Sequence, residues 1–382
     1  VDHVLKHKAY KFRIYPNKYQ EKLIAKTIGC ARFVYNHFLH RWNTTFAETG
    51  KGLSYNQCSA MLPKMKRVEE TEWLKEVDSI ALQSSLKNLA DSFSRFFNKQ
   101  NERPRFKSKM HPVQSYTTKH VNQNISIDGN LLKLPKIGHV PFAESRKLHG
   151  RILQATIRKK PSGKYFVSIL CEEKIHDFPK TESAIGIDLG ILDFAVLSDG
   201  QKVDNDRFTS KMEKKLKREQ RKLSRRALLA KKRGINLFEA KNYQKQKRKV
   251  ARLHEKVMNQ RTDFLNKLST DIIKNHDIIC IEDLHTKGML KNRKLAKSIS
   301  DVSWSSFVSK LQYKAEWYGK TIVKIDRWYP SSQICSECGH QDAKKALSIR
   351  EWMCITCHTN HDRDINASKN ILVEGLRKLS LT

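Results

Sequence analysis

The stretch Ala184-Ile-Gly-Ile-Asp-Leu-Gly190 is an apolar run that a single acidic residue interrupts beside two glycines. The pattern predicts a buried strand that ends at Asp188. An ionised carboxylate is costly to bury unless a metal ion or a cationic group accompanies it. We therefore expect Asp188 to bind a cation, and we expect the second part of the chain to be organised around this residue.

Two later stretches place acidic residues in the same kind of position. His276-Asp-Ile-Ile-Cys-Ile-Glu282 ends an apolar strand in Glu282, and His361-Asp-Arg-Asp364 opens a helical stretch with Asp364. Three such carboxylates can bind two Mg²⁺ ions, which activate a water and stabilise the leaving oxygen of a phosphodiester. The sequence therefore predicts a nuclease with catalytic residues Asp188, Glu282 and Asp364 and two Mg²⁺ ions, which Mn²⁺ could replace.

The charge of the chain indicates its partner. The 382 residues include 74 Lys and Arg against 39 Asp and Glu, a net charge of +35. This charge attracts polyphosphates, so nucleic acid is the expected partner. A basic ribosomal or membrane-surface protein would share the charge but would not need the three acidic stretches. No apolar run reaches the roughly 18 residues of a membrane span, and no signal-peptide core is present, so we expect an intracellular protein with no membrane partner.

The first part of the chain predicts a small β-barrel with a helical insertion. Residues 8–15 alternate basic and aromatic side chains as a strand does, and residues 17–100 carry apolar stripes at helical spacing, with Asn17 as a helix cap. Residues 124–134 and 156–169 each predict a hairpin. The first strand has no neighbouring strand in the sequence, so we expect it to join these hairpins in one barrel.

The second part predicts a mixed α/β layer. After Asp188 the chain returns in a strand over 192–200, the hairpin that opens ribonuclease-H-like folds. Residues 211–261 carry 20 Lys and Arg against 4 Glu along spaced apolar seams, which predicts a hairpin of two long basic helices. A strand over 278–282 is followed by a further helix and strand, which completes the layer.

Two basic segments are candidates for nucleic-acid contact. Pro104 stops a helix, so the extended run with Arg103, Arg105 and Lys107 fits a phosphate backbone, with a solvated linker as the alternative. The helical hairpin would repel itself without a polyanion, which favours nucleic-acid contact over a solvated face. Its candidate contacts are Arg225, Arg226, Lys231 and Lys232.

Four cysteines form two C-x₂-C pairs, Cys335-Ser-Glu-Cys338 and Cys354-Ile-Thr-Cys357. Two such pairs about fifteen residues apart are typical of a zinc ribbon, because each turn directs two thiolates at one tetrahedral ion. The alternatives are disulfides, which a reducing compartment disfavours, or a histidine ligand, His340 or His358, in place of a cysteine. With four protein ligands, the single Zn²⁺ is expected to be structural.

These motifs resemble those of TnpB, the RNA-guided nuclease of small bacterial insertion sequences and a relative of type V CRISPR effectors. The resemblance covers essentially the whole chain and rests on Tyr10-Lys-Phe-Arg-Ile-Tyr-Pro16, Cys30-Ala-Arg-Phe-Val-Tyr-Asn36, Gly186-Ile-Asp-Leu-Gly190, Ile281-Glu-Asp-Leu284, Ser331-Ser-Gln-Ile-Cys-Ser-Glu-Cys-Gly339 and His361-Asp-Arg-Asp-Ile-Asn-Ala367. It implies a RuvC nuclease domain with an inserted zinc ribbon, a wedge-type β-barrel with an inserted helical recognition subdomain, a transposon-derived guide RNA and double-stranded target DNA. It also implies a bacterial or archaeal cytoplasmic protein associated with the nucleoid.

The resemblance also assigns individual residues. Asp188, Glu282 and Asp364 align with the catalytic acids, whereas the neighbouring acids Asp193, Asp283 and Asp362 are expected to lie outside the metal ligands. Tyr55, Gln83 and Lys87 align with the recognition subdomain and are expected to read a short motif that flanks the target. Ser368 stands where the family commonly has alanine, a small change.

The expected fold is a multi-domain α/β protein. The predicted domains are 1–16, the first strand of the wedge barrel; 17–110, the helical recognition subdomain; 111–180, the rest of the barrel; 181–330, the RuvC nuclease domain with a basic helical hairpin over 208–275; 331–360, the zinc ribbon; and 361–382, the third RuvC motif and a C-terminal helix. Two alternative functions remain: an RNA-guided repressor that does not cut, disfavoured by the three acids, and a DDE-type transposase, disfavoured by the cysteine pairs within the nuclease half.

Overall fold

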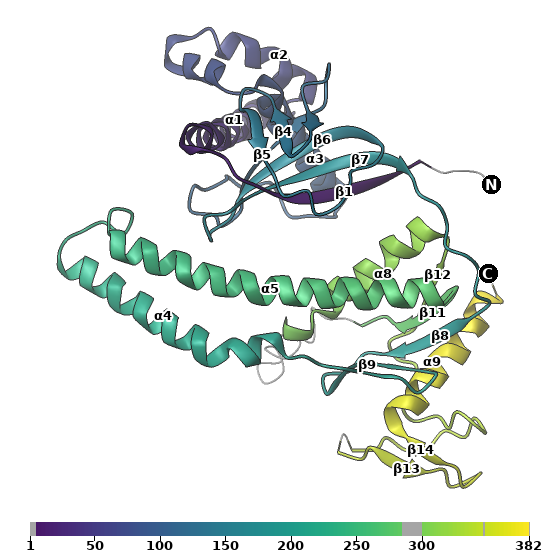
Figure 1. The fold of residues 1–382 in the computed structure, drawn as a ribbon. Helices are drawn as coiled ribbons and strands as arrows, with labels where there is room; N and C mark the ends of the chain where they lie inside the picture. Colours follow the sequence, from purple (N-terminus) through teal and green to yellow (C-terminus); the bar gives the residue numbers. More distant parts are fainter. Residues whose placement is uncertain (1–4, 285–299, 347, 382) are drawn as a thin grey trace. The chain divides into compact units, whose positions relative to one another are not determined.

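The computed structural model describes residues 5–284, 300–346 and 348–381. The chain divides into two units at the junction of Lys174 and Ile175 (Figure 1). None of the helices in the described ranges is long and apolar enough to span a bilayer.

The larger sheet of unit 1 pairs the first strand of the chain with the last strand of the unit. Strand β1 is antiparallel to β7 along its whole length, from Leu5 to Ile14. Tyr10, Phe12 and Ile14 are buried while the residues between them are exposed, so one face of β1 packs on the core. The sheet has the order β1-β7-β6-β2 and consists of β1 (Leu5–Ile14), β2 (Gln114–Lys119), β6 (Arg151–Lys159) and β7 (Tyr165–Lys174).

A smaller sheet lies between these strands in the sequence. Its first hairpin turns at Gly129, whose φ of +54° is a left-handed conformation that favours glycine. An isolated bridge between Ile14 and Phe142 joins the smaller sheet to the larger one. The hairpins predicted over 124–134 and 156–169 are both confirmed. The smaller sheet consists of β3 (Ser126–Asp128), β4 (Leu131–Leu134) and β5 (Gly138–Pro141).

The helices of unit 1 fill the long interval between β1 and β2. Asn17 caps the first helix as predicted: its side chain accepts from the Gln20 backbone at 2.9 Å, and the Gln20 side chain accepts from the Asn17 backbone at 3.0 Å. The apolar stripes of the first and last helices pack together, with Val34 and Leu82 fully buried. The elements are α1 (Lys18–Thr49), α2 (Tyr55–Met65), the 3₁₀ helix η1 (Glu69–Glu76) and α3 (Ser79–Phe97).

Unit 2 is built on a five-stranded sheet in the order β10-β9-β8-β11-β12. Strand β8 is antiparallel to β9 and parallel to β11, and β11 is parallel to β12. An antiparallel hairpin with parallel strands added beyond its first strand is the ribonuclease-H-like arrangement, so the predicted fold class is confirmed. The strands are β8 (Ala184–Asp188), β9 (Asp193–Leu197), β10 (Lys202–Asp204), β11 (Ile278–Glu282) and β12 (Thr321–Ile325).

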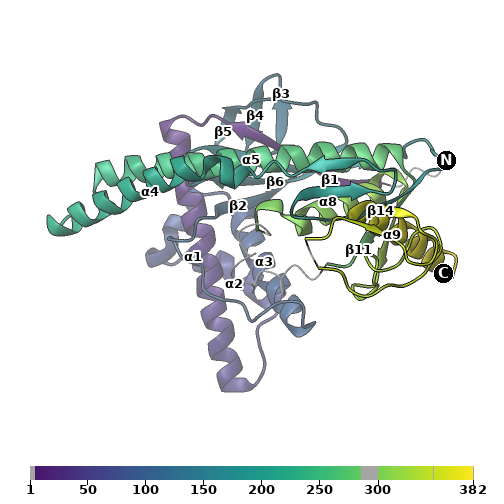
Figure 2. The ribbon, with the colours of Figure 1, turned by 90° about the horizontal axis from the view of Figure 1, so that it is seen from below.

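The helices of unit 2 include the predicted basic hairpin. Helices α4 and α5 run side by side in both views (Figures 1 and 2), and α8 packs on α5. Helix α9 lies against β8, β11 and β12. The elements are α4 (Phe208–Lys232), α5 (Lys241–Asn275), α8 (Trp304–Tyr318) and α9 (Arg363–Leu379), with a short antiparallel pair of β13 (Glu351–Met353) and β14 (Asn360–Asp362) before α9.

Two glycines allow α9 to approach the sheet closely. A Cβ atom on Gly186 of β8 would lie 2.1 Å from the Ser368 carbonyl oxygen, and one on Gly375 of α9 would lie 2.3 Å from the Cys280 sulfur of β11. These distances are far below van der Waals contact. Gly186 of the opening motif and Gly375 of α9 therefore set the separation between the sheet and the helix that carries Asp364.

Gly186→Ala is expected to lower the thermal stability of unit 2 and to reduce the nuclease activity that the sequence predicts, because the new methyl group must push α9 away from β8. Thermal unfolding and a cleavage assay would measure both effects. Gly29→Ala is the matched control, since a Cβ atom there meets nothing within 4 Å and Gly29 lies inside α1. That variant should be neutral or gain up to about 1 kcal/mol. Equal behaviour of the two variants would contradict the prediction.

Candidate active site and cysteine cluster

Asp188 and Glu282 end two neighbouring parallel strands. The register of β8 and β11 places Ile187 opposite Ile281, so the next residue on each strand is one of the two acids. Both side chains are half-buried. The carboxyl ends of parallel strands meet at one edge of a sheet, and the structure therefore brings these two predicted catalytic residues together.

Asp364 joins this edge from the first turn of α9. The Asp362 side chain caps the helix and accepts from the backbone N–H groups of Asp364 and Ile365, both at 3.0 Å. The close packing at Gly186 then holds the start of the helix near β8. Asp364 lies near enough to Asp188 for the two charges to interact, as does Glu282.

Burial and the neighbouring negative charges raise the energy of the ionised form of Asp188. Burial is the main cause that raises the pKa of Asp188 to about 8, and repulsion from Glu282 and Asp364 adds to it. Burial also raises the pKa of Glu282. Bound cations would stabilise the ionised carboxylates of this site. The residues present therefore fit divalent metal ions.

Asp188→Asn is expected to stabilise the protein in buffer without Mg²⁺ or Mn²⁺, and the gain should grow as pH rises. Folded Asp188 keeps its proton up to about pH 8 whereas the unfolded side chain releases it near its ordinary pKa, so the wild type loses stability between these values. Melting temperatures at pH 5 and pH 8 would measure this. Asp263→Asn, at an exposed position on α5, should show no such trend. An equal gain at both pH values would refute it.

A network of side chains outside the three acids holds the site in place. Ser331 donates from its hydroxyl to the Glu282 carboxylate at 2.8 Å. The buried amide of Asn370 on α9 donates to the Ser331 carbonyl at 2.8 Å, and Asn366 donates to the Ile334 carbonyl at 2.7 Å. Helix α9 is therefore tied to the segment that enters the cysteine cluster, and this segment in turn orients Glu282.

Arg350 pairs with Asp364 from the segment between the two cysteine pairs. Its guanidinium donates to the Asp364 carboxylate at 3.1 Å. The pairing of β13 with β14 explains this position, because the Arg363 N–H donates to the Arg350 carbonyl at 2.7 Å, next to the register pair Glu351 and Asp362. Arg350 thus offsets part of the negative charge of the site.

The neighbouring acids occupy different surroundings. Asp362 is the cap of α9 and also pairs with Lys202 at 2.6 Å. The exposed Asp283 lies 3.9 Å from both Lys324 and Arg327. Asp193 opens β9, half-buried, and its charge acts on Lys202. Helix capping and ion pairing therefore account for Asp362 and Asp283.

The four predicted cysteine ligands gather in one cluster. The sulfur atoms of Cys335, Cys338, Cys354 and Cys357 all lie within 4.8 Å of one another, an arrangement that could hold one tetrahedral metal ion. A hydrogen bond with the Thr359 side chain is the main cause that lowers the pKa of Cys357 to about 6, which favours the thiolate that binds metal. Among the described residues no other group of this kind has its ligand atoms so close together.

The histidine beside the cluster is a different one from the two considered as alternative ligands. His361 Nε2 lies 3.0 Å from the Cys335 sulfur, and the cluster includes neither His340 nor His358. His361 is buried and its ring packs 4.8 Å from the centroid of Trp352. We interpret His361 as a hydrogen-bond partner of a thiolate rather than as a fifth ligand.

The predicted nucleic-acid contacts lie at several places. In unit 1 the ammonium group of Lys87 lies 5.7 Å from the Tyr55 ring, with Gln83 exposed one turn earlier on α3. Arg103 donates to the Asn43 side chain and Arg105 pairs with Glu102. Lys107 lies 3.9 Å from the Tyr35 ring.

In unit 2 the residues Arg225, Lys231 and Lys232 are exposed on α4, whereas Arg226 donates to the Asn242 carbonyl of α5 at 2.8 Å.

Sequence reasoning missed Arg350, Ser331, Asn366 and Asn370. Asn366 and Asn370 stand four residues apart on one face of α9, a strongly amphipathic helix in which the buried apolar residues Ala367 and Ile371 directly follow them. Polar residues on the buried face of such a helix are a signal that they have partners. No pattern in the sequence indicated Arg350, because its place beside Asp364 depends on the pairing of β13 with β14.

Family models match three parts of the chain. A model named OrfB_IS605, described as "Probable transposase", matches residues 168–293, and a "Cas12f1-like, TNB domain" model matches residues 304–371. A "Helix-turn-helix domain" model matches residues 6–51, which form β1 and the single helix α1 in this structure. With the sheet order of unit 2, these matches indicate a transposon-related protein with a ribonuclease-H-like fold.

Sequence similarity to curated proteins identifies the family of this chain. A "Putative RNA-guided DNA endonuclease" of Streptomyces pristinaespiralis is 38% identical over 372 residues, which cover 97% of this chain and 89% of that protein. The chain belongs to the TnpB family, the OrfB family of IS605. The Escherichia coli K12 protein "Putative RNA-guided DNA endonuclease InsQ" is 32% identical, with 96% of this chain and 92% of that protein covered. A solved Cas12f1-sgRNA-target DNA complex contains a chain of similar fold, with a TM-score of 0.55 at 16% identity over 96% of this chain and 98% of that one.

Proposed function

We propose that this protein is an RNA-guided DNA endonuclease of an insertion-sequence element, which cleaves DNA matched to its guide beside a short flanking motif. The observation that carries the proposal is the convergence of Asp188, Glu282 and Asp364 from two strand ends and one helix start. The names of the relatives from Streptomyces pristinaespiralis and Escherichia coli support the same activity.

The three carboxylates would hold two Mg²⁺ ions. Ions bound there would supply an activated water and stabilisation of the leaving oxygen of the phosphodiester. The chain's own residues keep these ligands in place: Ser331 orients Glu282, and the Asp362 cap orients the first turn of α9. Arg350 holds Asp364 through an ion pair. In the cysteine cluster, one Zn²⁺ would be bound by four protein ligands and would serve the fold alone.

The expected partners follow from the net positive charge of the chain and from the separate roles that guide RNA and protein have in guided nucleases. Base pairing with a guide RNA would read the sequence, so the protein needs to hold backbones and to recognise a short flanking motif. Helices α4 and α5 present the basic surface for a backbone, and Tyr55, Gln83 and Lys87 form the candidate reader of the motif. Unit 1 would then contain the wedge and recognition parts, and the protein would work on the nucleoid.

A cleavage assay tests the proposal. The protein would be purified with the RNA that accompanies it, the RNA would be sequenced, and a matched duplex with a randomised flank would be offered in Mg²⁺ or Mn²⁺. Cleavage of the matched duplex beside one enriched flank is the expected result. Binding without cleavage in either metal would favour a repressor, and joined DNA ends would favour a transposase.

Neutralising the exposed tip of α4 is expected to flatten the salt dependence of nucleic-acid binding. In a variant with Arg225→Gln, Lys231→Gln and Lys232→Gln, each lost phosphate contact should reduce the slope of log K against log salt by about 0.7 to 0.9. Lys267→Gln is the control, because Lys267 pairs with Asp263 at 2.8 Å. Titrations at several salt concentrations measure the slope, and an unchanged slope would mean that the tip faces solvent.

A further inference from the structure

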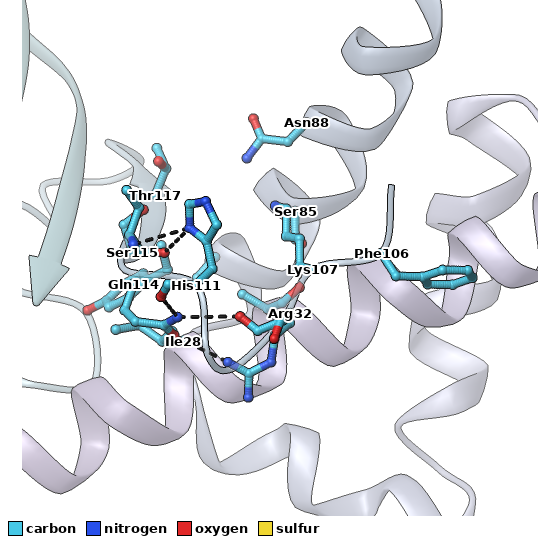
Figure 3. Close-up of a pocket in the computed structure, with 15 residues that line it drawn as sticks. Ile28, Arg32, Ser85, Asn88, Phe106, Lys107, His111, Gln114, Ser115 and Thr117 are labelled. Atoms are coloured by element: carbon cyan, nitrogen blue, oxygen red, sulfur yellow. Dashed lines mark hydrogen bonds between the residues drawn. The ribbon is translucent and has the colours of Figure 1, made fainter. Parts of the chain in front are cut away.

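A cavity of about 440 Å³ lies within unit 1 between α1, α3, strand β2 and the segment before β2 (Figure 3). This volume falls within the roughly 300–1,000 Å³ of pockets that bind small ligands. None of the residues assigned to the active site or to the flanking-motif reader lines it. The Lys87 and Gln83 side chains belong to another face of α3, whereas Ala81, Ser85 and Asn88 line the cavity.

The positively charged side chains of the cavity lining favour an anion as the ligand. Arg32 and Lys107 line the cavity together with His111, and the described lining residues include no aspartate or glutamate. Desolvation lowers the pKa of Lys107, whose ammonium group lies against the Tyr35 ring. A phosphate near Arg32 and Lys107 would stabilise their charged forms and so offset this cost of desolvation.

The rest of the lining suits a nucleobase. The apolar part of the lining consists of Ile28 and Ala31 of α1, Ala81 of α3 and Val113. Phe106 also belongs to the lining, but its ring, 58% exposed, points away from the other labelled residues in Figure 3. An apolar slot bordered by cations suits one unstacked base and its phosphate.

Two side-chain amides border the slot. The Gln114 amide is fixed, because it donates to the His111 carbonyl at 2.6 Å and accepts from the Arg32 guanidinium at 3.3 Å. The Asn88 amide takes part in none of the hydrogen bonds drawn in Figure 3. An amide carries both donors and an acceptor, so Asn88 can pair with the edge of a base.

We infer that this cavity binds one unpaired nucleotide of the guide RNA, with the base against the apolar part of the lining and the phosphate towards Arg32 and Lys107. The inference rests on the proposed function, since it presupposes a bound guide RNA. RNA is favoured over DNA because unpaired bases are a permanent feature of the loops and junctions of a folded RNA, whereas the target DNA has an unpaired strand only after the guide has displaced it.

The test uses Asn88→Trp in the full-length protein with its co-purified RNA. Asn88 is exposed on α3, so the indole is tolerated by the fold but fills the mouth of the cavity. Thr44→Trp, at an exposed position on α1 outside the cavity, is the matched control. Ultraviolet crosslinking with mass spectrometry and the RNA dissociation constant are the readouts, and thermal melts check that each variant folds.

A ribonucleotide crosslinked to the segment 106–117 is expected in the wild type and in the Thr44→Trp control. Asn88→Trp should lose this crosslink and bind RNA about 5- to 150-fold more weakly, the range for one stacked base. Asn88→Gln should retain the crosslink. A persistent crosslink with unchanged affinity in Asn88→Trp, or a crosslink to a deoxyribonucleotide, would overturn the inference. If the complex cuts matched DNA while no nucleotide crosslinks there, only this inference fails; if no RNA accompanies the protein, the proposed function fails too.

Discussion

Asp188→Ala is expected to abolish DNA cleavage while guided DNA binding survives. The substitution removes a carboxylate from the metal site but leaves the basic surfaces of α4 and α5 unchanged. The loss should exceed the roughly 10²- to 10³-fold that removal of a single catalytic hydrogen-bond donor costs, because a missing ligand affects the position and the charge of the ions together. Parallel cleavage and gel-shift assays with the co-purified RNA and a matched duplex would measure the two activities.

Asp283→Ala is the matched control for this prediction. Asp283 follows Glu282 directly, is exposed, and lies near only Lys324 and Arg327 among the contacts described above. This variant should cut at close to the wild-type rate. Normal cleavage by Asp188→Ala would mean that the site has been assigned to the wrong residues. Loss of binding in the same variant would mean that Asp188 also maintains the fold.

Cys338→Ser is expected to remove most of the zinc and to destabilise the C-terminal part of unit 2. A structural zinc contributes on the order of 10 kcal/mol to the folding of a small knuckle, and the loss of one of the four sulfurs leaves the tetrahedral site incomplete. Elemental analysis gives the metal content, and thermal unfolding gives the loss of stability. Cleavage should fall as well, since Arg350 and the segment after Ser331 both belong to this region.

Ser336→Ala in the same turn is the control for the loss of the thiol. The Ser336 hydroxyl is buried and makes no hydrogen bond within the described residues, so its removal should leave the zinc content unchanged. Full zinc occupancy after both Cys338 and Cys354 are replaced by serine would overturn the zinc-ribbon assignment.

The sequence predicted the nuclease sheet because its signals are local. An apolar run that ends in an acid identifies β8 and β11, and the spacing of two cysteine pairs identifies the cluster. The long amphipathic helices were predicted for the same reason. Even the strand β1 was expected to join the later hairpins, although its register with β7 could not be read from either strand alone.

The parts that could not be predicted depend on contacts between distant residues. Arg350 reaches Asp364 only because β13 pairs with β14, and Ser331 reaches Glu282 across 49 positions of sequence. The cavity beside Asn88 forms where two helices and a loop pack together, and no short sequence motif predicts this packing. A hydrogen-bond network or a cavity is a property of packing, so sequence patterns of neighbouring residues carry little information about it.

The hydrogen bonds that α9 makes couple metal binding at one candidate site to metal binding at the other. Asn366 and Asn370 fix this helix to the entrance of the cysteine cluster, and the same helix supplies Asp364. If an ion in the cluster orders this helix start, that ion raises the affinity of the carboxylates for their own ions. By reciprocity the carboxylate ions must then tighten zinc binding by the same factor. A chelator selective for zinc would therefore weaken the binding of the carboxylate ions without contacting their ligands.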